Sequence, residues 1–231
     1  MTEQGRVALV LVSHSRALAE GAAELAGQMA PDVLLIAAGG MDDGGIGTSY
    51  DAVEAALATA TADGGSAVVL TDLGSAVLTA ESVLELADPG VVERVRLADA
   101  PFVEGAVAAA VTANGGADLD TVLASAQAAG GLFAGSAAAP QETLADGAVR
   151  ATVTVRNPLG LHARPAAVLA RMLAGYEAKV QVDGANGASV LALMKLGATQ
   201  GHELVVVAEG PQAADAVTAF VEAVEGGFGE I

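Results

Sequence analysis

The chain has 231 residues, enough for one large domain or two small ones, and 53% of them are hydrophobic, which provides for a packed core and excludes disorder along most of the chain. Ten lysines and arginines against 28 aspartates and glutamates give a net charge of −18, and only 3% of residues are aromatic, so binding to nucleic acid or to an anionic membrane is excluded. The absence of cysteine excludes disulfides, thiolate chemistry and cysteine zinc sites.

The N-terminal segment lacks the features of a secretion signal, because its short apolar run ends at Ser13 and no small-residue cleavage site follows. The longest uncharged stretch, 121–141, consists mostly of Ala, Gly, Ser and Gln, with few Leu or Val for membrane insertion. We therefore expect a cytoplasmic protein without a membrane-inserted segment.

The charge is unevenly distributed, and this locates a domain boundary. Residues 1–147 contain 4 basic and 20 acidic residues, a net charge of −16, whereas residues 148–231 contain 6 and 8, a net charge of −2. The segment between them, AAGGLFAGSAAAPQETLADGA, has the Ala, Gly and Ser content of a flexible tether. We predict a first domain at 1–128, a flexible linker at 129–147 and a second domain at 148–231.

In the first domain, short apolar runs alternate with longer amphipathic stretches. The predicted strands are Val7–Val12, Val33–Ala37, Ala67–Leu70 and Val92–Leu97. The predicted helices are Ala17–Met29, Tyr50–Thr61, Ala76–Leu86, Val103–Ala113 and Leu119–Ala128. This alternation indicates βαβ units and an α/β fold with a mostly parallel sheet.

The second domain follows a different order. Its predicted strands are 149–155, 178–182 and 203–208, its predicted helices are 164–174, 189–196 and 212–225, and a turn region with the order Gly-Asn-Gly precedes the short helix. Short strands with intervening helices in about 80 residues predict a compact α+β domain.

A histidine and an aspartate follow two strands of the predicted parallel sheet. His14 comes after the first strand and Asp72 after the third, and ligands of such sheets bind outside the carboxyl ends of the strands. A carboxylate that holds one ring N–H leaves the other nitrogen free to attack, and the start of the 17–29 helix could receive a transferred anion. The alternative is a structural histidine and a solvated aspartate.

The second strand is followed by a glycine-rich loop that contains Asp42 and Asp43. Two acids are compatible with Mg²⁺, but they would oppose an anion on a neighbouring histidine. We favour a loop that shapes the mouth of the pocket, and we expect no metal site.

The clearest signal in the chain is NPLGLHARPAA, in which His162 and Arg164 precede a helix. The segment 157–160 has turn composition, and Pro165 followed by two alanines starts the helix. A nucleophilic imidazole, a helix N-terminus and a guanidinium within a few residues are typical of a site that holds phosphate. The alternative is a capping histidine beside a surface arginine.

Four blocks of the first domain, 8–29, 39–57, 68–86 and 98–119, resemble the multiphosphoryl-transfer subunits of phosphotransferase-dependent dihydroxyacetone kinases. The N-terminal domain of those proteins belongs to the mannose-type IIA family. The resemblance implies a doubly wound sheet that dimerises, with His14 phosphorylated. It also matches Asp72, less closely, with the helper carboxylate of the family.

Residues 148–231 resemble the histidine-containing phosphocarrier HPr, in NPLGLHARPAA and in ASVLALMKLGATQGHELVVVAEG. This implies an open-faced β-sandwich of four antiparallel strands and three helices, with His162 phosphorylated and Arg164 at the phosphate. Ser189 aligns with a position that some phosphocarriers phosphorylate for regulation, although a helix N-cap explains it as well. The apolar residues of 190–196 are expected to combine core with a docking patch, and His202 is expected to be structural.

Two phospho-accepting histidines on one tether indicate a phosphotransferase relay. The resemblance implies that phosphate from phosphoenolpyruvate reaches His162 through enzyme I and then passes to His14. Longer members of the family end in an enzyme I-like segment, whereas this chain stops at Ile231, so we expect enzyme I to act in trans. It then goes to ADP in the ADP-binding subunit of the kinase, which works with a dihydroxyacetone-binding subunit. We expect no bound cofactor and a homodimer through the IIA domain. The alternatives are a IIA–HPr component of a mannose-type sugar transporter and a regulatory module whose phosphorylation changes its affinity for a target.

Overall fold

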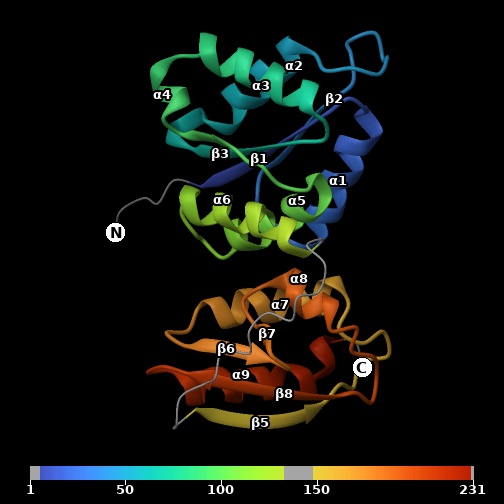
Figure 1. Cartoon of the computed structure of the whole chain (residues 1–231), viewed down its shortest axis with the longest axis vertical. Coiled ribbons are helices and arrows are strands. Elements are labelled where there is room, and N and C mark those ends of the chain that lie inside the picture. The colour runs from blue at the N-terminus through green and yellow to red at the C-terminus, as the bar shows by residue number, and fades with distance from the viewer. Residues whose placement is uncertain (1–5, 133–147, 230–231) are drawn as a thin grey trace. The chain divides into compact units, whose positions relative to one another are not determined.

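The computed structural model describes residues 6–132 and 148–229, and the chain divides into two compact units, Met1–Gly131 and Leu132–Ile231 (Figure 1). No helix within the described ranges is both long enough and apolar enough to cross a membrane.

The first unit is built on a parallel sheet. Its strands are β1 (Val7–Ser13), β2 (Leu35–Gly39), β3 (Ser66–Thr71) and β4 (Val95–Leu97), in the order β2-β1-β3-β4 with every pair parallel. All seven residues of β1 are buried, as expected for a central strand that is covered on both faces. The predicted parallel α/β sheet is confirmed.

Helices cover both faces of this sheet, which makes the fold doubly wound (Figure 1). Helices α1 (Arg16–Met29), α5 (Phe102–Asn114) and α6 (Leu119–Ala128) pack on the face that carries Leu9 and Leu11. Helices α2 (Tyr50–Ala60) and α3 (Gly74–Leu86) pack on the opposite face, which carries Val10 and Val12. Alternate residues of one strand thus belong to two cores, and the many buried alanines let the helices lie close to the sheet.

The second unit is an antiparallel sheet covered by helices. Its strands are β5 (Val149–Thr154), β6 (Lys179–Val182), β7 (Ala185–Asn186) and β8 (Glu203–Glu209), in the order β5-β8-β6-β7. Its helices are α7 (Ala163–Ala174), α8 (Val190–Lys195) and α9 (Ala213–Glu225), followed by the 3₁₀ segment η3 (Gly227–Gly229). Buried and less buried residues alternate along β8, as in a sheet with one covered face. The predicted open-faced β-sandwich is confirmed.

Several predicted boundaries differ from the structure. The start of the predicted strand Val92–Leu97 belongs to a short helix, α4 (Pro89–Val92), because Pro89 favours the first turn of a helix, and only Val95–Leu97 pairs with β3. The second strand begins two residues later than predicted, because the Val33 N–H bonds to the Ala30 carbonyl in the turn after α1. The predicted Gly-Asn-Gly turn region contains the short strand β7.

Short 3₁₀ segments complete the described chain. Segment η1 (Ala62–Gly64) precedes β3, and η2 (Ala129–Leu132) follows α6. Residues 129–132, at the start of the predicted linker, are therefore helical, and Ala129 is buried. The remainder of the predicted linker, 133–147, lies outside the described residues, so its flexibility stays a prediction.

Candidate functional site

The candidate site of the first unit lies at the carboxyl ends of β1 and β3. These strands are neighbours, but from β1 the chain crosses to β2 on one side, whereas β4 lies on the other side of β3. Such a reversal of direction creates a crevice beyond the strand ends. His14 directly follows β1 and Asp72 directly follows β3, so the parallel register places both residues at this crevice.

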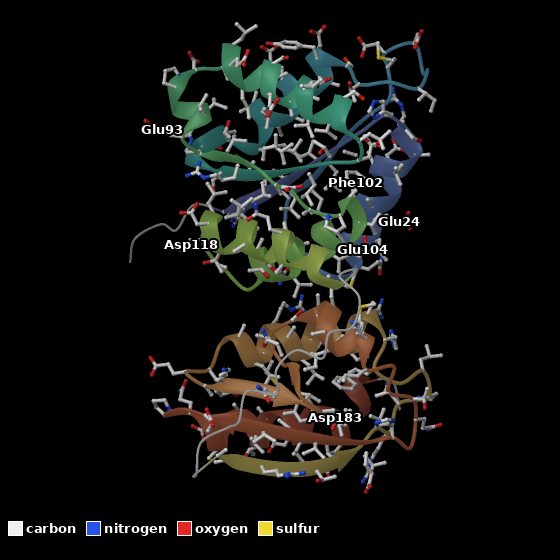
Figure 2. All side chains as sticks on the ribbon, in the orientation of Figure 1. Glu24, Glu93, Phe102, Glu104, Asp118 and Asp183 are labelled. Carbon is white, nitrogen blue, oxygen red and sulfur yellow. The ribbon has the colours of Figure 1, made fainter. Side chains whose placement is uncertain are left out.

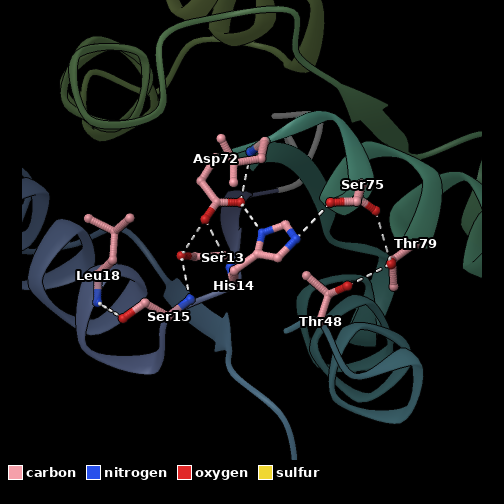
Figure 3. A network of polar contacts seen from close by, with 9 residues as sticks. Ser13, His14, Ser15, Leu18, Thr48, Asp72, Ser75 and Thr79 are labelled. Carbon is pink, nitrogen blue, oxygen red and sulfur yellow. Dashed lines mark hydrogen bonds and ion pairs between the residues drawn. The ribbon is translucent and has the colours of Figure 1, made fainter. Parts of the chain in front are cut away.

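The carboxylate of Asp72 accepts four hydrogen bonds (Figure 3). Its Oδ1 atom accepts from the Nδ1 ring atom of His14 at 2.9 Å and from the Leu73 N–H at 2.8 Å. Its Oδ2 atom accepts from the Ser13 hydroxyl and from the His14 backbone N–H, each at 2.9 Å. The carboxylate is therefore fixed in one orientation toward the imidazole ring.

These contacts control the ionisation of Asp72. Burial raises the pKa of its carboxyl, but the hydrogen bonds from the His14 side chain, the His14 backbone and Ser13 outweigh burial, so the pKa is lowered from its ordinary value. Asp72 is consequently ionised at neutral pH and can only accept hydrogen bonds. The hydrogen between Asp72 and His14 therefore lies on Nδ1.

The other ring nitrogen of His14 carries the lone pair. The Nε2 atom lies 2.7 Å from the hydroxyl oxygen of Ser75, which donates to it in this tautomer (Figure 3). The side chain of His14 retains 20% of its exposure, so a reaction partner can reach the ring. The imidazole is thus oriented with a nucleophilic nitrogen directed at the start of α3.

The position of Nε2 changes the expected location of a transferred anion. We expected the anion at the start of the 17–29 helix, but the first turn of α1 is capped by Ser15, whose hydroxyl accepts from the Leu18 N–H at 3.3 Å. Helix α3 has Leu73 as its N-cap residue and no side-chain cap hydrogen bond. The uncapped helix end beside Ser75 is therefore the better anion position.

Sequence reasoning did not find Ser75, although it lies three residues after Asp72. A serine in the first turn of a helix is common as a surface residue, so only the contact with His14 distinguishes it. The hydroxyl of Thr79, one turn further along α3, donates to the Ser75 carbonyl at 3.2 Å and lies 2.8 Å from the Thr48 hydroxyl (Figure 3). These hydroxyls connect the glycine-rich loop to the site.

The glycine-rich loop contributes backbone rather than carboxylates. The Gly47 N–H donates to the His14 carbonyl at 2.9 Å, and Asp43 uses its Oδ1 atom to accept from the Gly45 N–H at 2.9 Å. Asp42 is exposed. Within 6–132 and 148–229, no three His, Asp or Glu side chains form a group that could hold a metal ion. That this loop shapes the mouth of a pocket stays a prediction.

His162 lies at the N-terminus of α7 in the second unit. It is the N-cap residue of the helix, with extended backbone (φ −80°, ψ −174°), and Arg164 is the exposed second residue of α7. The predicted helix start, with Pro165 in its first turn, agrees with this geometry. The structure thus places both residues at the N-terminal, positive end of the helix.

The turn before His162 is held by a buried asparagine. Asn157 is fully buried, and its Nδ2 atom donates to the Gly160 carbonyl at 2.6 Å, which also accepts from the His162 N–H at 2.9 Å. Gly160 has a positive φ of 69°, and a Cβ atom there would clash with the Ala198 backbone. The turn therefore fixes the backbone position of His162, and Asn157 holds the turn. The turn composition of 157–160 alone did not indicate this role of Asn157.

Two further candidates of the second unit have structural contacts. Ser189 is the N-cap of α8, and its hydroxyl accepts from the Ala192 N–H at 3.3 Å, as the capping interpretation expects. The Nε2 atom of His202 lies 3.8 Å from Asp183 Oδ2, away from any helix start. In the expected docking patch, Val190 and Leu193 are buried, whereas 37% of Met194 is exposed.

Comparisons with known proteins address each unit separately. Residues 8–123 match the family model described as "PTS system fructose IIA component", named EIIA-man, which covers half of the chain. Residues 149–226 match the model described as "PTS HPr component phosphorylation site".

Some curated relatives match the chain across both units, and others match only part of it. The phosphoryl donor subunit DhaM of the PEP-dependent dihydroxyacetone kinase of Providencia stuartii is 36% identical over 248 residues, covering 97% of this chain and 50% of the relative. The DhaM subunit of Pantoea ananatis is 39% identical over 244 residues, covering 97% and 51%. That of dihydroxyacetone kinase 2 of Listeria innocua is 41% identical over 106 residues, covering 46% and 84%. The chain spans about half the length of the first two relatives.

Proposed function

Because this chain belongs to the EIIA-man family of phosphotransferase-system IIA components and carries an HPr domain, we propose that it relays phosphoryl groups between two histidines. Phosphate from phosphoenolpyruvate enters on His162 from phospho-enzyme I and passes to His14. From His14 it goes to ADP in the ADP-binding subunit of a dihydroxyacetone kinase, and finally to dihydroxyacetone. The chain is then a phosphotransferase with phosphohistidine intermediates.

The observation that carries this proposal is the geometry around His14. The ionised Asp72 holds the proton on Nδ1 at 2.9 Å, so the lone pair lies on Nε2, beside Ser75 and the uncapped start of α3. A nucleophile, an orienting carboxylate and an anion position are the parts that a phosphohistidine site needs. A structural histidine would need neither the exposure of the ring nor the uncapped helix.

His162 and Arg164 are the proposed entry point. An imidazole at a helix N-cap lies beside backbone N–H groups and the positive end of the helix dipole, which stabilise a phosphoryl group on the ring. The guanidinium of Arg164 adds a permanent positive charge with a fixed donor geometry. Ser189 caps α8, and regulatory phosphorylation there remains the second possibility that the resemblance suggests.

Transfer between the two histidines requires no net proton movement when the phosphorylated ring of His162 carries a proton on its other nitrogen. The Nε2 lone pair of His14 attacks the phosphorus on that ring, the new N–P bond forms, and the His162 N–P bond breaks with its electron pair returning to the ring, which leaves as neutral imidazole. The Nδ1–H of His14 donates to Asp72 throughout and stabilises the positive charge that develops on the ring. A short flexible connection would raise the effective concentration of one domain at the other to about mM.

The remaining assignments follow from the relatives and the resemblance. We propose that the ADP-binding and dihydroxyacetone-binding subunits are the partners, because the relatives are named as phosphoryl donor subunits of that kinase. We propose a homodimer through the IIA unit, action in the cytoplasm, and phosphate supply from phosphoenolpyruvate with no bound cofactor. Sedimentation of the purified chain tests the dimer.

A second candidate is delivery of phosphate to a sugar transporter. The description of the matched family as a fructose IIA component favours it, because that description names a sugar. The kinase assignment is supported by relatives that match 97% of the chain across both units.

One reconstitution separates these functions. The purified chain is incubated with enzyme I and labelled phosphoenolpyruvate, either with both kinase subunits, ADP and dihydroxyacetone, or with membranes that contain mannose-type transporter components and sugar. Dihydroxyacetone phosphate formed only when every component is present supports the kinase. Labelled sugar phosphate supports the transporter, and absence of label on both histidines overturns the relay.

A further inference from the structure

A buried hydroxyl joins the two strand ends at the site. Ser13, the last residue of β1, is 0% exposed, and its Oγ donates to Asp72 Oδ2 at 2.9 Å (Figure 3). The same oxygen accepts from the Ser15 N–H at 3.1 Å. Ser15 is the N-cap of α1, so one hydroxyl contacts both the carboxylate that follows β3 and the N-cap residue of α1.

Only one arrangement of these hydrogens satisfies all the groups. The ionised Asp72 can only accept, so the Ser13 hydroxyl must donate to it, and the Ser15 N–H must donate to the Ser13 oxygen. His14 lies between the two serines, and its own N–H donates to the same carboxylate oxygen at 2.9 Å. The backbone on both sides of His14 is thus fixed relative to Asp72.

We infer that Ser13 is a positioning residue for phosphoryl transfer through His14: its hydroxyl fixes Asp72 in the orientation that keeps the ring proton on Nδ1 and the lone pair on Nε2. This inference rests on the proposed function of His14. Ser13 itself touches neither the ring nor the phosphoryl position, because the ring contacts are made by Asp72 and Ser75.

Removing the hydroxyl should loosen this arrangement. In Ser13→Ala, Oδ2 of Asp72 keeps only the His14 N–H, and the Ser15 N–H loses its acceptor. A carboxylate with fewer donors has a less depressed pKa and rotates more freely, so the Nδ1–H tautomer of His14 is less strongly preferred. A buried hydrogen bond to a charged group is worth about a tenfold change in an equilibrium or rate.

The test uses the full chain and two readouts. Imidazole nitrogen NMR on the unphosphorylated protein measures the fraction of the Nδ1–H tautomer, and rapid-quench labelling from enzyme I and labelled phosphoenolpyruvate measures phosphorylation of His14 against pH. The variants are Ser13→Ala, Ser13→Thr and the control Ser82→Ala, which removes an exposed hydroxyl bonded to the Leu78 carbonyl of α3.

For Ser13→Ala we expect a smaller Nδ1–H fraction and roughly tenfold slower labelling of His14. Ser13→Thr should restore the tautomer, and Ser82→Ala should match the wild type in both readouts. An unchanged tautomer and labelling rate in Ser13→Ala would overturn the inference.

Two further outcomes are decisive. If Ser13→Ala does not fold, Ser13→Cys takes its place, because cysteine keeps the volume but is a weaker donor, and its tautomer fraction and labelling rate should be intermediate. If neither variant folds, Ser13 is a core residue only and the inference is overturned. If wild-type His14 is never labelled, the proposed function fails, while the tautomer measurement still decides whether Ser13 positions Asp72.

Discussion

Replacing Asp72 by asparagine removes the charge that orients His14 but keeps the shape of the side chain. In the wild type, the Leu73 N–H donates to Oδ1 at 2.8 Å and the His14 N–H donates to Oδ2 at 2.9 Å. An asparagine amide has a single acceptor oxygen, so its NH₂ group must face one of these backbone N–H groups whichever way it is turned. The substitution therefore breaks the site without creating a cavity.

Both orientations of the amide weaken the nucleophile. With the NH₂ group beside Nδ1, the ring must accept there, and its proton moves to Nε2, where it removes the attacking lone pair. With the amide oxygen beside Nδ1, a neutral hydrogen bond replaces a charge-assisted one, and the difference between the two is about 1–1.5 kcal/mol. We expect phosphorylation of His14 in Asp72→Asn to slow by about 5- to 12-fold in this orientation, and by more in the other.

Rapid-quench transfer of labelled phosphate measures this rate. Enzyme I and labelled phosphoenolpyruvate phosphorylate the chain, and peptide mapping separates label on His14 from label on His162. The matched control is Asp118→Asn, because Asp118 also accepts a backbone N–H, from Thr121 at 2.8 Å, but at the start of α6. A rate in Asp72→Asn within about twofold of the wild type would refute the reasoning, since no transition-state interaction would have been lost.

The same variant predicts a pH-dependent stability difference. The pKa of Asp72 is lowered on folding, so its carboxylate contributes stability above its unfolded pKa and loses it as the pH falls through the folded pKa. The deficit of Asp72→Asn in free energy of unfolding should therefore be largest at neutral pH and diminish below about pH 4. Urea unfolding at a series of pH values measures it, and a deficit that grows toward acidic pH would contradict this sign.

Other substitutions test the second unit and the order of the relay. Arg164→Ala should slow phosphorylation of His162 by weakening a contact of about 1.5–3 kcal/mol while folding changes little, because the side chain is exposed, and unaltered kinetics would remove Arg164 from the site. His162→Ala should abolish labelling of both histidines with enzyme I alone, and a separate phosphocarrier should rescue it. His14→Ala should leave His162 labelled and block transfer to the kinase subunit. Label on His14 in His162→Ala without added carrier would overturn the proposed order of the relay. Gly160→Ala should destabilise the second unit by about 1–3 kcal/mol in urea unfolding because its positive φ and the Ala198 backbone exclude a Cβ, and an unchanged midpoint would contradict this.

The sequence predicted most of the fold because its periodic signals are strong. Helix α6 has the predicted bounds, Leu119–Ala128, and β1 extends the predicted strand by one residue, Ser13. Alternation of strands and helices sufficed for a parallel sheet, and the carboxyl-end rule brought His14 and Asp72 together before any distance was known. These features depend on the hydrophobic periodicity of single segments and on the topology of parallel sheets.

The missed features depend on contacts between distant parts of the chain. The hydroxyls of Ser13 and Ser75 interact with partners 59 and 61 residues away, and serine near a strand end or a helix start carries no signal of such a partner. The short helix α4 was missed because Val91 and Val92 favour a strand locally, whereas Pro89 and the turn at Asp88 decide the backbone. The sequence also did not indicate which helix start lies beside Nε2 of His14, because this depends on the orientation of the imidazole ring.

In the proposed relay, the two histidine sites stabilise a phosphoryl group with different chemical groups. The first unit lies in the part of the sequence with a net charge of −16, and a phosphoryl group adds negative charge there. Arg16, the basic residue nearest His14 in sequence, donates to the Met41 carbonyl at 3.3 Å, so its contact in the structure is with the loop. In the proposed relay, a phosphoryl group on His14 is stabilised by a hydroxyl and the positive end of α3, whereas the exposed Arg164 follows His162 by two residues at the start of α7. Neutral donors hold an anion less tightly than a guanidinium does, and a site that must pass its phosphate onward benefits from that difference, because overly strong binding would retain the group on the intermediate.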